Sequence, residues 1–226
     1  LDALTGKPCS DFGVNGRIDL SKGVGSVELG EYSITSPPAI LGDLVSVGSA
    51  IGDNRATDLE RGIVRAIDAQ TGSIQWLWDP IPKSTNDKAR ATWNGDSNLS
   101  TGAANAWAPI TADPSSGLIY VPTSSPSPDF FGGERLGDNL YSNSIVALNG
   151  FTGEVVWFQQ LVHHDLWDYD IPAQPTLTTI RRQGEVHQAV IVVTKTGMLF
   201  AFDRYSGEPI HEIEERPVPQ LSLIHI

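Results

Sequence analysis

A turn signature that occurs four times constrains the fold of this chain more than any other feature of its sequence. Each copy has Asp or Asn, two variable residues, Thr or Ser, and then Gly, at residues 2–6, 68–72, 149–153 and 203–207. The acidic or amide side chain accepts hydrogen bonds from the turn, and Gly adopts the left-handed conformation that closes it. In two copies a tryptophan, Trp76 or Trp157, follows the Gly by four residues, where it can pack against a neighbouring unit. The pattern predicts repeated tight hairpins.

The segments between these turns read as short strands. Apolar, β-branched runs bounded by turn residues occur at residues 39–41, 44–48, 117–121, 189–194 and 198–202. The glycines of successive turns are 66, 81 and 54 residues apart. Since one four-stranded propeller blade needs roughly 40–50 residues, long loops must be inserted, and such loops often carry sites. Helical periodicity is nearly absent, and the polar segment 83–99 reads as a long loop. We therefore predict an all-β fold of about four four-stranded blades from a β-propeller.

Composition excludes several classes of partner. The 226 residues carry a formal net charge of −12, so the chain repels phosphate backbones and we expect no nucleic-acid partner. No stretch of the sequence approaches the roughly 18 apolar residues of a membrane span. Cys9 is the only cysteine, so the chain can form no internal disulfide.

The densest chemical cluster lies at residues 163–172. Three carboxylates (Asp165, Asp168 and Asp170), two imidazoles and two aromatic rings fall within eight residues. Crowding of acids beside aromatic rings raises carboxylate pKa values, as a general base requires, and acids two residues apart can share one hard cation. The alternative is a solvated turn. Adjacent histidines point apart on a strand and no third nitrogen or sulfur ligand accompanies them, so we do not expect zinc.

Two sets of residues resemble a known enzyme family. The Asp-x-x-Thr-Gly-x-x-x-Trp repeats resemble the tryptophan-docking motifs of pyrroloquinoline-quinone (PQQ) dehydrogenases, and residues 164–170 (HDLWDYD) resemble their catalytic segment. Residues 163–175, 195–203 and 215–220 are most similar to the membrane-bound glucose dehydrogenase branch. The resemblance runs to about residue 220. It implies an eight-bladed propeller, truncated here at both ends, with PQQ and a divalent cation near its axis.

The resemblance also implies roles for individual residues. Asp168 matches the catalytic base that takes the substrate hydroxyl proton while hydride passes to PQQ, and Lys195 matches a cationic residue near the quinone oxygens. A positive charge there would stabilise a developing oxyanion. Trp107 matches the indole floor under the planar cofactor, and Asn105 and Thr35 match polar contacts to it. The alternatives are an exposed hairpin lysine for Lys195 and a core tryptophan for Trp107.

A metal site is implied less directly. Asp53 stands where methanol dehydrogenases of the family place a calcium-binding Glu, and their calcium-binding Asn falls near Ser125 or Ser127. With Asp168, these positions imply a site for calcium or magnesium. Asp170 occupies the position whose carboxylate accompanies lanthanide use in some alcohol dehydrogenases, but the glucose branch has Asp there too.

The resemblance implies an oxidoreductase that acts on a sugar or polyol and passes electrons to ubiquinone or another acceptor. A PQQ alcohol or quinate dehydrogenase is the alternative enzyme, and a non-catalytic propeller scaffold, which would have the repeats without the acid cluster, is the alternative class. We expect a periplasmic protein, with its parent anchored to the inner membrane by a region that precedes residue 1.

Both ends of the chain look cut. The first turn begins at residue 2 with no strand before it, and residues 221–226 follow a Pro-rich loop. We expect residues 1–220 to be part of the propeller and residues 221–226 to be a non-native tail. Because blades and an early arginine of the family are missing, we expect the isolated 226 residues to be inactive in dye reduction with added PQQ and calcium.

Overall fold

Short antiparallel strands make up most of the regular structure in the computed structural model, which describes residues 1–216. Those residues also contain a 3-10 helix, η1 (Lys88–Thr92), and a single-turn helix, α1 (Ser97–Ser100). The strands are β1 (Tyr32–Ser33), β2 (Ala39–Leu41), β3 (Leu44–Val47), β4 (Ala50–Ile51), β5 (Val64–Asp68), β6 (Ile74–Trp78), β7 (Thr111–Asp113), β8 (Leu118–Pro122), β9 (Ser144–Asn149), β10 (Val155–Gln160), β11 (Thr176–Arg182), β12 (Glu185–Val193) and β13 (Leu199–Asp203).

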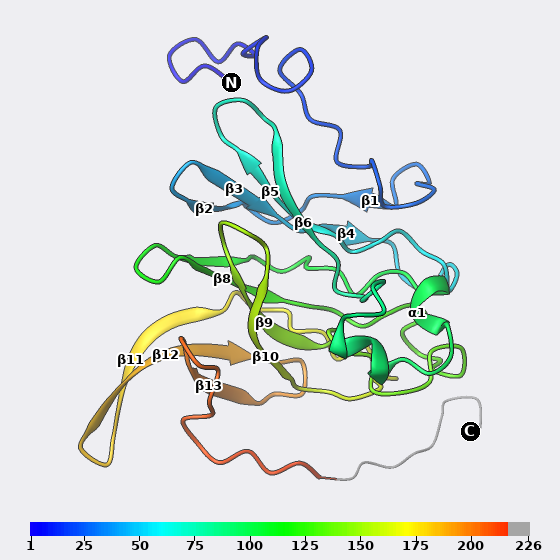
Figure 1. Cartoon of the computed structure of the whole chain (residues 1–226), viewed down its shortest axis with the longest axis vertical. Helices are drawn as coiled ribbons and strands as arrows, with labels where there is room; N and C mark the ends of the chain where they lie inside the picture. Colours follow the sequence, from blue (N-terminus) through cyan, green and yellow to red (C-terminus); the bar gives the residue numbers. More distant parts are fainter. Residues whose placement is uncertain (217–226) are drawn as a thin grey trace.

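The strands pair into four antiparallel sheets. β2-β3-β5-β6 and β7-β8-β9-β10 are four-stranded, β11-β12-β13 is three-stranded, and β1 pairs with β4 in a small two-stranded sheet. In the three larger sheets the strands are ordered as they occur along the chain, which is the meander of a propeller blade. Figure 1 shows these sheets stacked in sequence order along the long axis of the molecule, from the blue and cyan sheet above to the orange sheet below. The predicted partial β-propeller is confirmed.

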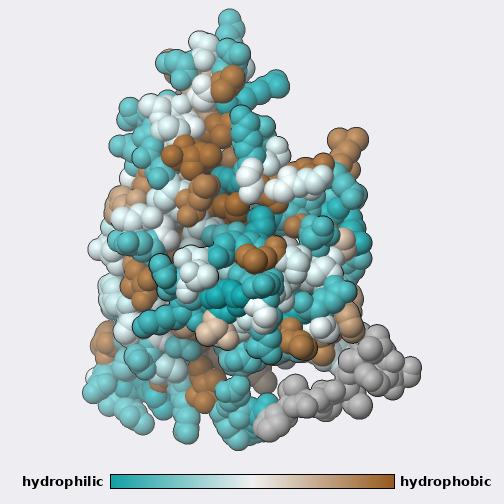
Figure 2. All heavy atoms as spheres, turned by 45° about the vertical axis from the view of Figure 1, so that its right-hand side comes forward, coloured by the Kyte–Doolittle hydropathy of each residue, from teal (hydrophilic) through white to brown (hydrophobic). Residues whose placement is uncertain are grey.

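The core lies between consecutive sheets. The two inner strands of the middle sheet are buried on both faces: every residue of β8 is buried, and so is every residue of β9 except its last. In β8, Ile119 and Val121 pack toward the first sheet, in a cluster that contains Trp76, whereas Leu118 and Tyr120 pack toward the third, in a cluster that contains Phe202. This division follows from the alternation of side chains along a strand. On the face shown in Figure 2, apolar side chains lie in small separate patches among hydrophilic ones.

All four copies of the repeat form the predicted turn. In each copy the Asp or Asn Oδ1 accepts a hydrogen bond from the backbone N–H three residues later, at 2.7–3.2 Å. The tryptophan of one sheet then docks on the turn of the next. Trp76 donates its indole N–H to Gly150 O (2.9 Å), and Trp157 donates to Arg204 O (3.1 Å). The repeat therefore joins neighbouring blades, as its tryptophans predicted.

Gly153 is the position where this docking leaves least room. Its φ is +76°, and a Cβ added there would lie 2.7 Å from the Trp76 ring. We expect Gly153→Ala to destabilise the folded protein by roughly 2–4 kcal/mol, since it combines left-handed strain with overpacking. Gly184 is the matched control, because its φ is +88° but nothing lies within 4 Å of an added Cβ. Gly184→Ala should cost only about 1–2 kcal/mol in denaturant unfolding; equal losses would show that Trp76 does not restrict the turn.

The segment 83–99 differs from the expected loop. It contains η1 and α1, and Trp93 within it is 1% exposed and donates its indole N–H to Leu140 O at 2.6 Å. Single helical turns are too short to produce a periodic apolar pattern, so periodicity could not predict them.

Two expectations concern the membrane and the tail. Within residues 1–216, no helix combines the length and hydropathy needed to cross a bilayer. Residues 221–226 lie outside the described part of the chain.

Candidate active site

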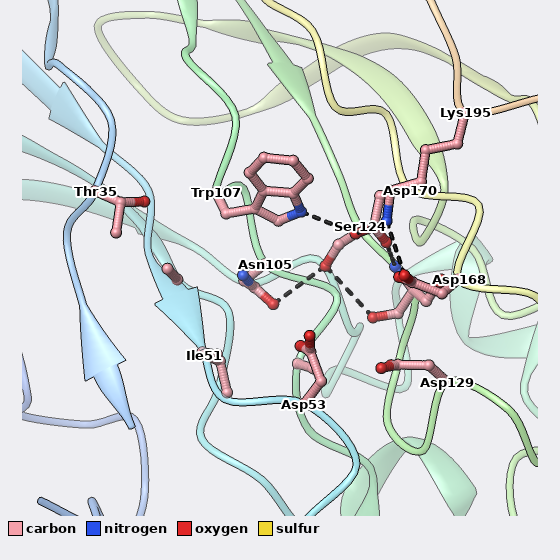
Figure 3. Close-up of a pocket in the computed structure, with 13 residues that line it drawn as sticks. Thr35, Ile51, Asp53, Asn105, Trp107, Ser124, Asp129, Asp168, Asp170 and Lys195 are labelled. Carbon is pink, nitrogen blue, oxygen red and sulfur yellow. Dashed lines mark hydrogen bonds and ion pairs between the residues drawn. The ribbon is translucent and has the colours of Figure 1, made fainter. Parts of the chain in front are cut away.

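A pocket of about 340 Å3 lies where loops connected to all three larger sheets meet. Figure 3 shows acidic, amide and hydroxyl side chains around it, with one indole and one lysine. The lining residues are Thr35, Ala50, Ile51, Asp53, Ala103, Asn105, Trp107, Ser124, Ser125, Asp129, Asp168, Asp170 and Lys195. Seven of the eight site residues expected from the sequence are among them.

Asp165 shapes the loop that carries the expected base. This buried carboxylate lies outside the pocket lining and accepts hydrogen bonds from the backbone N–H groups of Trp167 (3.0 Å) and Tyr169 (2.6 Å). Ser125 Oγ and Asn143 Nδ2 also donate to it, at 2.5 and 2.9 Å. The loop closes around this carboxylate, with Asp168 at a φ of +58°. A non-glycine residue in this conformation is held there by its surroundings, as often happens at functional sites.

Lys195 pairs with both acids at the other end of the loop. Its Nζ lies 2.9 Å from Asp168 Oδ2 and 3.1 Å from Asp170 Oδ2. Although burial opposes it, pairing with these two carboxylates raises the pKa of Lys195. Burial raises the pKa of Asp170 to about 6, and the charge of Asp168 adds to this effect while Lys195 opposes it. A fixed cation therefore faces two acids inside the pocket.

Trp107 forms one wall of the pocket and is held at both ends. Its indole N–H donates to Asp170 Oδ2 (2.9 Å), its carbonyl oxygen accepts from Ser36 Oγ, and Lys195 Nζ lies 5.8 Å from the ring centroid. Asn105 is largely engaged within the protein, because its amide donates to Ser49 O (2.7 Å) and accepts from Ser124 Oγ (3.1 Å). Figure 3 places Thr35 on the Trp107 side, away from the acids.

Asp53 and Asp129 extend toward each other at the opposite end of the pocket (Figure 3). Asn54 connects the two loops: its amide donates to Asp129 Oδ2 and its Oδ1 accepts from Asp129 N, both at 3.0 Å. Burial raises the pKa of Asp129 to about 7, and the charges of Asp53, Asp168 and Asp170 add to the shift. Desolvation and Asp168 also raise the pKa of Asp53. The pocket therefore holds more negative charge than Lys195 neutralises.

The sequence reasoning missed Asp129 and chose Ser127 instead. The Ser127 side chain is buried, does not line the pocket, and donates to Ala56 O. Its neighbour Ser125, the other position considered, lines the pocket and donates to Asp165. Asp129 ends the same Ser/Pro-rich segment, and it is the only carboxylate there. A search for an oxygen donor of higher charge in that segment would have found it.

A metal ion would need ligands beyond clustered acids. Among residues 1–216, no three His, Cys, Asp or Glu side chains converge closely enough to hold one by themselves. Neutral oxygens of the pocket, or oxygens of a molecule bound beside them, would have to complete the coordination of a hard cation.

Comparison with known proteins decides which family has this site. Residues 1–225 match the family model described as "PQQ: Glucose/ethanol/alcohol dehydrogenase, beta-propeller domain". The chain belongs to this PQQ propeller family.

The relatives act on different substrates, to judge by their names. The chain is 38% identical to quinoprotein glucose dehydrogenase A of Acinetobacter calcoaceticus and 36% identical to quinate/shikimate dehydrogenase (quinone) of Acinetobacter baylyi, over 97% and 96% of its length. It spans 27% of each of these proteins. The solved quinohemoprotein alcohol dehydrogenase ADHIIG of Pseudomonas putida matches with a TM-score of 0.74 and 29% identity, over 89% of this chain and 29% of that one.

The pocket of this PQQ propeller fits a flat cofactor together with a cation. The anchored indole of Trp107 gives a flat apolar wall, and Lys195 supplies a cation beside it. The surplus of carboxylates at Asp53 and Asp129 calls for a positive charge that no side chain in the pocket lining supplies there. Planar aromatic molecules stack on such walls, and hard cations prefer carboxylate oxygens.

Proposed function

We propose that the protein containing this chain is a PQQ-dependent dehydrogenase that oxidises a CH–OH group of a sugar or polyol of the glucose type. The observation that carries the proposal is the contact of Lys195 with Asp168 and Asp170 beside the Trp107 ring, in one pocket. A non-catalytic scaffold would have no use for a desolvated acid cluster facing an anchored lysine.

Each of the main residues of the pocket would have a separate role in the reaction. Bound PQQ would supply the electron acceptor, taking up the hydride equivalent of the alcohol. Asp168, which the Asp165 loop directs into the pocket, would receive the substrate hydroxyl proton on a carboxylate oxygen. Lys195 would stabilise negative charge that develops on an oxygen beside it. Trp107 would support the ring, with Thr35 and Asn105 at its polar edge.

Asp53 and Asp168 would hold a divalent cation, calcium or magnesium, with Asp129, which faces Asp53, as a third acid and neutral oxygens completing the coordination. Such a cation would orient the substrate oxygen and stabilise negative charge on it. The carboxylate of Asp170 is occupied by Trp107, Ser125 and Lys195, so we assign it to holding the indole and the lysine rather than to the metal.

Cation binding is expected to release a proton at mildly acidic pH. Since the pKa of Asp129 is about 7, its carboxyl is mostly protonated at pH 6 and must ionise to bind a cation. Calcium affinity should therefore rise by up to about tenfold per pH unit below pH 7 and level off above it. Calorimetry at pH 6 in buffers of different ionisation enthalpy measures the released proton. Asp129→Asn should abolish most of that release, and unchanged release would contradict the assignment; Asp138→Asn, at an exposed site outside the pocket, is the control.

The proposal of a glucose-type substrate and a quinone acceptor is supported by the names of relatives, among them a quinoprotein glucose dehydrogenase and a quinate/shikimate dehydrogenase (quinone). We also propose a periplasmic location, with the parent protein attached to the inner membrane and passing electrons to ubiquinone. A PQQ quinate or alcohol dehydrogenase is the competing substrate assignment, since relatives with those names match over similar lengths.

The decisive experiment uses the full-length protein in reduction of an artificial electron acceptor. Apoprotein reconstituted with PQQ and calcium should oxidise glucose, and omission of PQQ should abolish the activity. Quinate and simple alcohols, measured alongside, distinguish the competing substrates. Absence of both PQQ binding and activity with every sugar and alcohol would refute the proposal.

A further inference from the structure

A fully buried arginine outside the pocket connects the two loops that carry its acids. Arg135, between β8 and β9, donates from Nη2 to Asp165 O (2.6 Å) and Pro128 O (2.9 Å), and from Nη1 to Asn139 Oδ1 (3.0 Å). We propose that Arg135 is a positioning residue that sets Asp129 against Asp168. This inference rests on the proposed function for its catalytic consequence.

The contacts of the Arg135 guanidinium show how it can affect the positions of both Asp129 and Asp168. Pro128 directly precedes Asp129, so the arginine fixes the backbone from which Asp129 enters the pocket. Asp165 begins the loop of Asp168, and its carboxylate holds that loop closed through Trp167 N and Tyr169 N. Movement of Arg135 would therefore change the separation between the acid pair at one end of the pocket and the base at the other. A misplacement of about 1 Å in such a site can reduce turnover about 100-fold.

The charge of Arg135 is not used in an ion pair. Within residues 1–216, no carboxylate oxygen lies within ion-pairing distance of the guanidinium, which donates to backbone and amide oxygens. Burial lowers the pKa of Arg135 to about 10, while Asp165 and Asp129 oppose the shift, so the side chain stays charged at neutral pH. Burying a charge is costly unless it makes several good hydrogen bonds. The planar guanidinium of arginine has several N–H donors and can bind acceptors on three segments at once. The compact ammonium group of lysine cannot reproduce that geometry.

The experiment is to replace Arg135 by lysine in the full-length protein, keeping the charge but losing the fork. Backbone amide hydrogen exchange shows whether the Asp168 loop is still held, and it needs no cofactor. We expect exchange at Trp167 and Tyr169 to accelerate at least tenfold, while exchange in the β2-β3-β5-β6 sheet stays unchanged. In the reconstituted enzyme we expect kcat to fall about 10- to 100-fold with KM changed less than threefold. If Arg135→Lys does not fold, Asn139→Ser, which removes one guanidinium acceptor, is measured by the same criteria.

The control for general destabilisation is Gly153→Ala, which strains a blade contact outside the pocket lining. At a temperature well below both melting transitions, Gly153→Ala should keep a normal kcat and normal exchange at Trp167 and Tyr169. The proposal is overturned if the arginine variant keeps exchange rates within threefold of wild type at these amides, or if its losses match those of Gly153→Ala. If wild-type protein neither binds PQQ nor turns over, the proposed function fails, whereas the exchange measurement still decides whether Arg135 positions the loop.

Discussion

Replacement of Asp168 by asparagine should reduce kcat of the reconstituted full-length enzyme by about 10²–10⁴-fold, the usual contribution of a positioned general base. Asparagine is nearly isosteric and tolerates the left-handed backbone, so the φ of +58° at this residue should be retained. Its amide oxygen can still accept from Lys195, but it cannot take up a proton from a substrate hydroxyl. The loss should therefore appear in kcat with little change in PQQ affinity.

The measurement is steady-state dye reduction together with a PQQ titration of the apoprotein by indole fluorescence. Asp138→Asn is the matched control, since it makes the same chemical change at an exposed carboxylate outside the pocket lining. If Asp168→Asn retains more than about a tenth of wild-type kcat, another group must act as base. If it abolishes PQQ binding instead, the asparagine substitution disrupts assembly of the site, and the kcat loss does not identify Asp168 as the base.

The fold could be predicted well because its main signals are local. The Asp or Asn of each repeat reaches a backbone N–H three residues away, and Gly153 and Gly207 need a left-handed φ that few other residues adopt. The indole N–H of Trp76 donates to a backbone carbonyl of the next turn, and Trp157 makes the equivalent contact one blade later. The segment 83–99 lacked such a signal, because it is held by burial of Trp93 against Leu140. These two residues are 47 positions apart in the sequence.

The pocket could be predicted only where a residue type was itself distinctive. Asp168 and Asp170 lie in a crowded acidic segment, whereas Lys195 was identified only through the resemblance to the family, since its place in a hairpin is typical of an exposed lysine. Asp129 is the only carboxylate of its Ser/Pro-rich segment, but the contacts with Asn54, 75 residues earlier, that hold it at the pocket leave no local pattern in the sequence. In the irregular segment 123–129 there is no strand alternation to say which side chains face inward, so Ser127 was selected only through the resemblance to the calcium-binding Asn of methanol dehydrogenases.

Arg135 illustrates a second limit. Its position in the sequence, after two glycines and a glutamate, resembles any exposed loop, and charged residues in loops are usually solvated. Only the folded structure shows that three chain segments converge on its side chain.

Replacement of Lys195 by methionine should be the second most damaging change. It leaves Asp168 and Asp170 without their shared cation, in a pocket that already contains Asp53 and Asp129. Removal of one preorganised donor to a developing oxyanion typically costs about 10²–10³-fold in kcat, and we expect a loss of that order. Because Lys195 lowers the pKa of Asp170, which is about 6 in its presence, the variant should hold Asp170 protonated to a higher pH. The acidic limb of its pH–rate profile should therefore move to higher pH.

Lys195→Arg separates the charge from the shape of the side chain. Arginine keeps a cation near both carboxylates and can stack on the Trp107 ring, so the acidic limb should stay near its wild-type position even if kcat falls. Cofactor affinity, followed by titration of the apoprotein, should weaken in Lys195→Met and be largely retained in Lys195→Arg. An unchanged pH profile in Lys195→Met would mean that Lys195 does not control the ionisation of the acids. Equal kcat losses in both variants would mean that the position of the ammonium, rather than its charge, is what the reaction requires.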